Sequence, residues 1–522
     1  MNLKDFSYAL YLCKWTDAEV DRAKPHRNAG KEIVQFVFTF ISALTCLFTF
    51  YIVASLRNDF DRINWFILAK TGTYFHWYST IFITSLIFML YACFVFFSGL
   101  NAPWKKQHVT LSWINFIVLI LFIGAGIVVL VLLCNSYPAW RIVANLSYNG
   151  LGPFLHILGY IIWVCLLHYV AKLVSSGASV GLKLIVILTY SIVFVLLCFV
   201  PFLLSCPCIT NNSTQMKKPR LIGHRGAPSL APENTIMSFQ KAIGCSVLVI
   251  ESDVRISLDG VPFLMHDDTL LRTTDVSTLY PSRKNHRAES FLWAEIQKLS
   301  AGKWFLDTNP TLSSQYLSSS DKTESSNQAV PSLDEYVTIA KLHNKSILFD
   351  LVRPPEGHPH RHNWVNITVG AILNTNISQE QVLWLYTDSS RSIVKELAPN
   401  FTLISPSYVN NASELGIKGY NVMYTDIINV GKLYTLPVIS YVINEEWLFS
   451  WAWCQGVWAV TTNYPCKLNA MDRPVYTMTK TGYIAMWVII ELFAIISIAI
   501  YVWKCKRFID SGLKYELTAG IS

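Results

Sequence analysis

Six long apolar runs constrain this chain of 522 residues more than any other feature. Each run is close to the ~20 residues that a helix needs to cross a bilayer. Hydrophobic residues make up 52% of the chain, which is too apolar for a soluble protein of this length. We therefore expect a multi-pass membrane protein, in contact with lipid, whose spans lie near residues 33–56, 80–99, 109–134, 154–174, 184–204 and 483–503.

Lysine and arginine residues predict the orientation of these spans. They gather before the first run, between the second and third runs, around the turn between the fourth and fifth, and after the last run. Basic residues near spans favour the cytoplasmic side. We expect cytoplasmic segments at 1–32 and 504–522, five spans within 33–205, and a large domain at 219–474. This domain then faces the exoplasm or an organelle lumen, and the membrane is the plasma membrane or an endomembrane.

Glycosylation sequons agree with this orientation. Every Asn-x-Ser/Thr sequence falls in a segment expected outside the cytoplasm, and the first of them lies in a short outer loop of its own. The candidates are Asn145, Asn211, Asn212, Asn344, Asn366, Asn376, Asn400 and Asn411. The outer segments hold an odd number of cysteines, so one or two disulfides are expected rather than a full framework.

Short apolar runs separated by helical stretches indicate the fold of the large domain. Such runs are typical of buried parallel strands. A (β/α)₈ barrel needs about 250 residues, which fits the interval 219–474. We predict the α/β class, with a TIM barrel inserted in a six-helix transmembrane region. The candidate strands are 220–223, 247–250, 261–265, 346–349, 382–385, 402–404, 438–443 and 457–460.

Acidic and imidazole side chains follow several of these candidate strands. Catalytic groups of a TIM barrel stand at the carboxyl ends of its strands. The carboxylates of Glu251, Asp253 and Asp350 would together favour a hard divalent ion, Ca²⁺ or Mg²⁺. His224 and His266 could then act as general base and general acid, since imidazole titrates near neutral pH.

Arg225, beside His224, is a natural partner for a phosphate group, since a guanidinium can bind two oxygens at once. A metal, an acid–base pair and a guanidinium together indicate cleavage of a phosphate ester.

The order and spacing of these residues resemble the signature of the glycerophosphodiester phosphodiesterases, and the apolar runs resemble the multi-pass animal branch of that family. The matching residues are His224-Arg225-Gly226, Pro232-Glu233-Asn234-Thr235, Glu251-x-Asp253, His266-Asp267, Arg272-Thr273-Thr274 and the late Asn444 and Thr461-Thr462-Asn463.

The resemblance implies a TIM barrel that hydrolyses glycerophosphodiesters, with the neighbouring glycerol hydroxyl as nucleophile. It implies that Glu251 and Asp253 bind metal, that His224 and His266 exchange a proton, and that Arg225 binds phosphate. Glu233, Asn234 and Asn444 would line the same pocket.

One departure from the family pattern falls at the fourth strand. Where most members have Glu-x-Lys, this chain has Asp350-Leu351-Val352 followed by Arg353. The shorter Asp350 reaches one methylene less far. Arg353 could replace the missing Lys charge in the pocket, although its offset of one position faces the opposite side of a regular strand.

These observations leave three classes of function. The first is a membrane-anchored, metal-dependent phosphodiesterase acting on glycerophosphodiesters or related lysophospholipid or glycosylphosphatidylinositol-type head groups. The second is an inactive barrel that serves as a binding or signalling module. The third, a transporter, is disfavoured on the expectation that the middle of each span lacks charge. The net charge of +8 is attributed to the cytoplasmic flanks and not to nucleic-acid binding, and the oligomeric state stays open.

Overall fold

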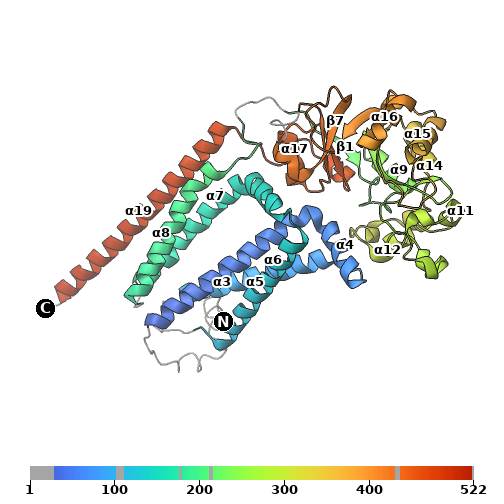
Figure 1. The fold of residues 1–522 in the computed structure, drawn as a ribbon. Helices are drawn as coiled ribbons and strands as arrows, with labels where there is room; N and C mark the ends of the chain where they lie inside the picture. The colour runs from blue at the N-terminus through green and yellow to red at the C-terminus, as the bar shows by residue number, and fades with distance from the viewer. Residues whose placement is uncertain (1–28, 102–110, 176–178, 211–215, 430–434, 520–522) are drawn as a thin grey trace. The chain divides into compact units, whose positions relative to one another are not determined.

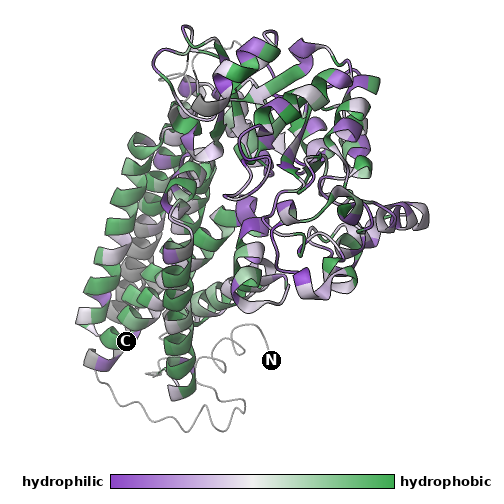
Figure 2. Ribbon diagram, turned by 45° about the vertical axis from the view of Figure 1, so that its right-hand side comes forward, coloured by the Kyte–Doolittle hydropathy of each residue, from purple (hydrophilic) through white to green (hydrophobic). Residues whose placement is uncertain are grey.

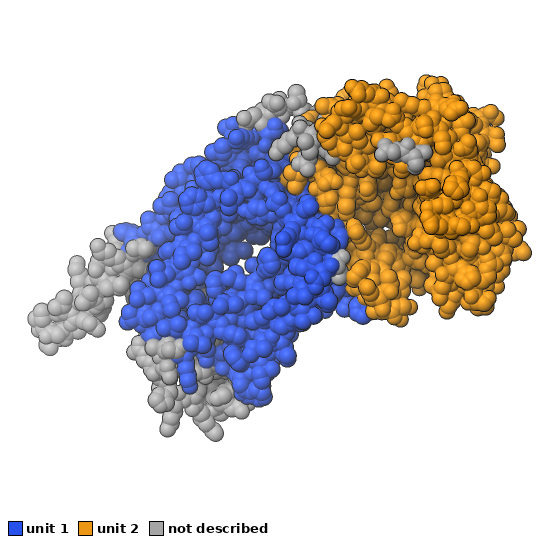
Figure 3. Space-filling model, in the orientation of Figure 1, with its two compact units in different colours: residues 1–57, 77–213, 478–522 blue, residues 58–76, 214–477 orange. Residues whose placement is uncertain are grey.

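The computed structural model describes residues 29–101, 111–175, 179–210, 216–429 and 435–519. The chain divides into two compact units, which Figure 3 colours separately. The first comprises residues 1–57, 77–213 and 478–522, and the second comprises 58–76 and 214–477. The expected segment 1–32 lies almost entirely outside the described residues, as do Asn211 and Asn212.

The first unit is a helical bundle. In the described part of the chain, six helices are long and apolar enough to cross a membrane. Figure 2 shows them as predominantly hydrophobic along their length. This confirms the expectation of a multi-pass membrane protein. The helices, labelled in Figure 1, are α3 (Ala29–Ser55), α5 (Trp77–Asn101), α6 (Trp113–Ser136), α7 (Trp140–Ser175), α8 (Val180–Leu203) and α19 (Lys480–Ala519). The first apolar stretch, Ile33–Thr71, continues past α3 through α4 (Phe60–Thr71), which belongs to the second unit.

The loop expected around Asn145 is a helix in the structure. Helix α7 begins at Trp140 and continues through Pro153, although a proline usually ends or kinks a helix. Asn145 therefore lies near the start of α7, where its side chain accepts a hydrogen bond from Asn149 Nδ2 at 2.9 Å. The prediction of a loop was wrong because α7 begins well before the apolar run at 154–174 from which the fourth span was predicted.

The expectation of uncharged span centres is wrong for the sixth span. Glu491 lies well inside α19. Its Oε1 accepts hydrogen bonds from Tyr160 of α7 and from Trp487, each at 2.7 Å. A polar side chain at this depth needs such partners because lipid offers none. The contact therefore joins α7 and α19 within the bundle.

The second unit contains a closed barrel. Nine strands form one sheet, and the ends of that sheet meet through pairing of β1 with β2. Eight strands run parallel, and β3 alone pairs antiparallel with β2. The strands are β1 (Arg220–Gly223), β2 (Val249–Ile256), β3 (Pro262–Leu264), β4 (Ser346–Leu351), β5 (Val382–Leu385), β6 (Thr402–Ser405), β7 (Ile417–Met423), β8 (Val438–Tyr441) and β9 (Ala459–Thr462).

Two strand predictions differ from the structure. The run at 261–265 forms β3, which lies outside the parallel barrel. Its place is taken by β7, which the sequence analysis missed because Lys418, Gly419 and Asn421 interrupt its apolar character. The eightfold barrel prediction is nevertheless confirmed.

Helices cover the outside of the barrel. Tyr336 shows how one of them is attached, since its buried hydroxyl donates to the backbone oxygens of Ile250 and Leu348. A disulfide between Cys245 and Cys466 joins the ends of α9 and α18. The helices of this unit are α4 (Phe60–Thr71), α9 (Ile236–Gly244), α10 (Val276–Leu279), α11 (Trp293–Ile296), α12 (Lys303–Thr308), α13 (Ser319–Ser326), α14 (Leu333–Leu342), α15 (Trp364–Asn374), α16 (Asp388–Leu397), α17 (Glu446–Cys454) and α18 (Pro465–Asn469).

An apolar layer closes the interior of the barrel. It takes one residue from each of seven parallel strands, all of them buried. Because side chains alternate along a strand, residues two and four positions further on share the same inward face. The layer consists of Ile222, Val249, Leu348, Leu383, Ile404, Ile439 and Ala459.

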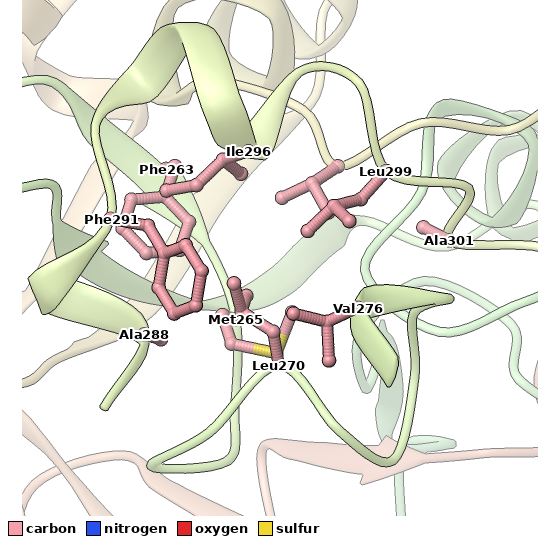
Figure 4. Packing of buried hydrophobic residues seen from close by; sticks show 10 residues of the cluster. Phe263, Met265, Leu270, Val276, Ala288, Phe291, Ile296, Leu299 and Ala301 are labelled. Atoms are coloured by element: carbon pink, nitrogen blue, oxygen red, sulfur yellow. The ribbon is translucent and has the colours of Figure 1, made fainter. Parts of the chain in front are cut away.

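The stretch after β3 has a small core of its own. Figure 4 shows Phe263, Met265 and Leu270 packed against Phe291 and other side chains from residues 276–301. Burial of these groups holds the connection that carries residues 266–272 at the barrel mouth. This matters for the site, because that connection supplies a histidine, a carboxylate and an arginine.

Candidate active site

Strand alternation brings the predicted groups together above the apolar layer. His224 follows Ile222 by two positions, directly after the end of β1. Glu251 and Asp253 follow Val249 by two and four in β2. Asp350 follows Leu348 in the same way, and the register of β2 and β4 sets it directly beside Asp253. The inward face of three neighbouring strands therefore carries one imidazole and three carboxyl groups.

These carboxyl groups perturb one another. Burial and the neighbouring Asp253 and Asp350 raise the pKa of Glu251 well above its usual range. Loss of hydration in the barrel mouth, and then the negative charge of Asp253, raise the pKa of Asp350 to about 6. Burial would raise the pKa of Asp253 as well, but the Arg225 guanidinium holds it below its usual range. Negative charge is thus concentrated here without a full set of cationic partners.

The donor set fits a divalent cation by its chemistry. Crowded carboxylate oxygens are the ligands that Ca²⁺ and Mg²⁺ prefer. In the arrangement seen here, Glu251 Oε2 accepts from the Arg225 backbone N–H at 2.8 Å, and Asp253 Oδ2 accepts from Asn234 Nδ2 at 3.0 Å. Within the described residues, no three acidic, histidine or cysteine side chains converge as an ion site. The metal roles of Glu251, Asp253 and Asp350 remain a prediction.

His224 is held by an amide at the end of the last barrel strand. Its Nδ1 lies 2.6 Å from Asn463 Oδ1. An amide oxygen only accepts, so Nδ1 carries the proton and Nε2 is left with a free lone pair. Burial, and then the positive charge of Arg225, lower the pKa of His224 to about 4. The ring is therefore neutral near pH 7 and able to accept a proton at Nε2.

Arg225 occupies a tight turn directly after β1. Its φ of 51° is left-handed, which is uncommon for a residue other than glycine. The next residue, Gly226, has φ 86°, and a Cβ there would meet Ser238 Oγ at 2.4 Å. The turn directs the Arg225 guanidinium to Asp253 at 3.2 Å and to Glu233 at 2.9 Å. Such a backbone is typical of functional sites.

Arg272 is the main site residue to which the sequence analysis gave no role. It donates to both oxygens of Glu233, at 2.7 and 2.8 Å, and to both oxygens of Asp267, at 2.6 and 2.8 Å. Its guanidinium also lies over the rings of Trp65 and Trp304, at 4.8 and 5.7 Å. The signal was present, since Arg272 belongs to the matched motif and Asp267 lies five residues before it, but Glu233 is 39 residues away.

His266 completes the polar network at the mouth. Its Nδ1 lies 2.7 Å from Asp267 Oδ1, and about half of its side chain is exposed. Asp267 thus joins His266 to Arg272, and Glu233 joins Arg272 to Arg225. The resulting chain of ion pairs runs from the β3 connection to the turn after β1. A pocket lies beside it, lined by Glu233, Asn234, Leu264, Met265, His266, Thr273, Ala301 and Val330.

Two predicted pocket residues lie differently from the others. Asn444, at the end of β8, is buried, and its Oδ1 accepts from the backbone N–H of Asn463 at 2.9 Å. It therefore supports the residue that holds His224. Arg353 is exposed beyond the end of β4, and its pocket role remains a prediction.

Comparisons with known proteins agree with this geometry. Residues 224–376 match the model of the glycerophosphoryl diester phosphodiesterase family. The mouse glycerophosphodiester phosphodiesterase domain-containing protein 5 is 34% identical over 97% of this chain and 83% of its own. The mouse glycerophosphoinositol inositolphosphodiesterase GDPD2 is 34% identical over 97% of this chain and 95% of its own. The mouse glycerophosphodiester phosphodiesterase domain-containing protein 4 is 30% identical over 98% of this chain and 88% of its own.

Proposed function

This chain belongs to the glycerophosphoryl diester phosphodiesterase family, a family of phosphoric diester hydrolases, and we propose that it hydrolyses glycerophosphodiesters or related lysophospholipid or glycosylphosphatidylinositol-type head groups. One observation carries the proposal. Two imidazoles, each engaged at Nδ1, share a barrel mouth with Arg225 and three carboxyl groups. This combination supplies a base, an acid and a phosphate-binding group.

His224 serves as the general base in this proposal. Its neutral Nε2 accepts the proton of the glycerol hydroxyl next to the phosphate, and that oxygen attacks phosphorus. His266 donates a proton to the leaving alcohol, so one P–O bond forms and one breaks. The two imidazoles then exchange roles as water opens the cyclic phosphate. Arg225 binds the phosphate oxygens throughout, with its guanidinium oriented by Glu233.

Enzymes of this family generally depend on a divalent metal, and we propose Ca²⁺ or Mg²⁺ for this chain. Glu251, Asp253 and Asp350 would hold it. When bound, such an ion would stabilise negative charge on the phosphate oxygens. Asn234 Nδ2 and the Arg225 backbone keep Asp253 and Glu251 in place.

We further propose that the barrel lies on the exoplasmic or lumenal side. The Cys245–Cys466 disulfide within the barrel unit supports this, since disulfides persist in oxidising compartments. Five sequon asparagines of the barrel are exposed, which is compatible with glycosylation. They are Asn344, Asn366, Asn376, Asn400 and Asn411.

The second candidate is a barrel that binds phosphodiesters without turning them over. The observation that favours it is Asp350, which is shorter than the glutamate of most family members. A single assay separates the two candidates.

The assay measures hydrolysis of glycerophosphocholine, glycerophosphoinositol and lysophosphatidylcholine by the purified full-length protein, with and without Ca²⁺ or Mg²⁺. His224→Ala is the control. Metal-dependent turnover that the variant lacks supports the enzyme, and the products show which side of phosphorus is cut. If neither the wild type nor the variant hydrolyses any of these substrates although both are folded, the result supports the binding module.

A further inference from the structure

We infer that the segment 58–76, which connects the first two membrane helices, is part of the active site, and that its Asp61 is a positioning residue for His224. The inference rests on the proposed function. Residues 58–76 belong to the barrel unit rather than to the helical bundle, although they stand between α3 and α5 in sequence. The contacts below are therefore all internal to that unit.

The start of the segment is bound to the end of β8. Asn58 Nδ2 donates to the backbone oxygen of Val442 at 2.9 Å, and Asn58 Oδ1 accepts from the backbone N–H of Asn444 at 2.8 Å. The side-chain amide of Asn58 thus bonds the backbone after β8 through one donor and one acceptor, as the peptide groups of a neighbouring strand would. Next to it, the Tyr424 hydroxyl donates to Asp59 Oδ2, and both groups are buried.

The rest of the segment is bound at the other side of the mouth. Trp65 of α4 lies over the Arg272 guanidinium and 6.2 Å from the Trp304 ring. The Tyr74 hydroxyl then donates to the backbone oxygen of Pro310 at 3.3 Å. A cation near the faces of two indoles is stabilised by their π-systems. The segment therefore crosses from β8 to the β3 connection, with Asp61 fixed in between.

Asp61 contacts the amide that holds the catalytic imidazole. Asn463 Nδ2 donates to Asp61 Oδ2 at 3.4 Å, while Asn463 Oδ1 lies 2.6 Å from His224 Nδ1. The side-chain amide of Asn463 can flip by about 180° and exchange its oxygen and nitrogen. Only the orientation with Oδ1 toward His224 suits a protonated Nδ1. An ionised carboxylate beside Nδ2 selects that orientation, because it accepts but cannot donate. Burial raises the pKa of Asp61 to about 7, so the selection is complete only above that pH. Asp61 thereby keeps the lone pair on His224 Nε2.

The other oxygen of Asp61 supports a functional role. Asp61 Oδ1 is buried and has no hydrogen-bond partner among the described residues. Such a group costs stability, and a site that tolerates it usually has a use for it. The wider consequence is that the first two spans do more than anchor the barrel, because they deliver a part of its site.

The test compares Asp61→Ala, Asp61→Asn and Lys70→Ala in the full-length protein. Asp61→Asn keeps an acceptor oxygen for Asn463 but adds an amide donor that also suits the flipped Asn463, whereas Asp61→Ala removes the acceptor altogether. Lys70 lies on the same helix, is exposed, and its ammonium stands over Phe66 of that helix. Each variant is assayed for kcat and KM on the substrate that wild type turns over, and for thermal unfolding.

We expect Asp61→Ala to lower kcat by about 10–100-fold, the range for a group that orients a catalytic side chain. KM should change little, Asp61→Asn should recover only part of the rate, because its amide no longer selects one orientation of Asn463, and Lys70→Ala should match wild type. The inference is overturned if Asp61→Ala retains full kcat, or if Asp61→Asn is as slow as Asp61→Ala. It is equally overturned if Asp61→Ala and Lys70→Ala lose the same rate. If wild type hydrolyses nothing in the panel, the proposed function fails first, and the inference falls with it.

Discussion

Replacing Arg272 by methionine is the most informative perturbation of this site, because Arg272 joins both sides of the ion-pair network. Methionine has a similar length and no charge. The change removes four hydrogen bonds of 2.6 to 2.8 Å to Glu233 and Asp267, along with the contacts to Trp65 and Trp304.

The structure allows the magnitude to be worked out. Breaking a buried ion pair by removing one partner costs about 3–5 kcal/mol. Glu233 is only 9% exposed but keeps Arg225 as a partner, and Asp267 is 27% exposed and can be hydrated. These compensations favour the lower end, about 3 kcal/mol. For a domain of this size, that corresponds to a fall in Tm of about 6–12 °C.

The assay is thermal unfolding of the full-length protein in detergent, followed by tryptophan fluorescence with the disulfides intact. Lys303→Met is the matched control, since Lys303 is 60% exposed and pairs with Asp275 at 3.3 Å. An exposed pair is worth about 0–1 kcal/mol, so its Tm should hardly move. If the two variants unfold at the same temperature, the network does not stabilise the barrel in the way described.

Three further predictions concern the acid limb of stability, the metal and glycosylation. Arg272 and Arg225 outweigh burial and hold the pKa of Glu233 below its usual range, and Arg272 does the same for Asp267. The two carboxylates therefore stabilise the fold fully above their unfolded pKa values of about 4, and this stabilisation should be lost as the pH falls further. Thermal unfolding measured between pH 3 and 7 should show Tm falling steeply at the acid end, and Arg272→Met should make that fall shallower. At a concentration of 100 times the Kd at pH 7, Ca²⁺ or Mg²⁺ should raise the unfolding free energy by about 2.7 kcal/mol. The same ion concentration should stabilise less at pH 5, because the pKa of Asp350 is raised to about 6 and its protonation weakens binding. A Glu251→Gln variant that is stabilised equally would contradict the metal site. Exposed Asn376 should carry a glycan, so Asn376→Gln should migrate faster on a gel than wild type before glycosidase treatment and equally after it.

Much of the architecture could be predicted from local pattern. Apolar runs near the length of a bilayer crossing give the six spans, because lipid leaves the backbone no alternative to a helix. The barrel follows from strands that end in polar groups. Side chains alternate between the two faces of a strand, so Glu251 and Asp253 must share a face. This conclusion needs no knowledge of the rest of the chain.

The tertiary structure decided what depends on contacts distant in sequence. Strand β7 is stabilised by its neighbours β6 and β8 despite Lys418 and Asn421, so its own composition did not reveal it. Arg272 stood in the motif, but only folding brings Glu233 and Asp267 to its two sides.

The segment 58–76 shows this limit most clearly. Asp61 and Asn463 are separated by 402 positions, and no periodicity or spacing connects them. Taken alone, the segment is a charged connection between two spans. A local pattern records which face of a strand or helix is buried, whereas the partner on that face is set by the packing of the whole barrel unit. The sequence therefore determined the class of site and most of its residues, and the fold decided which groups hold them in place.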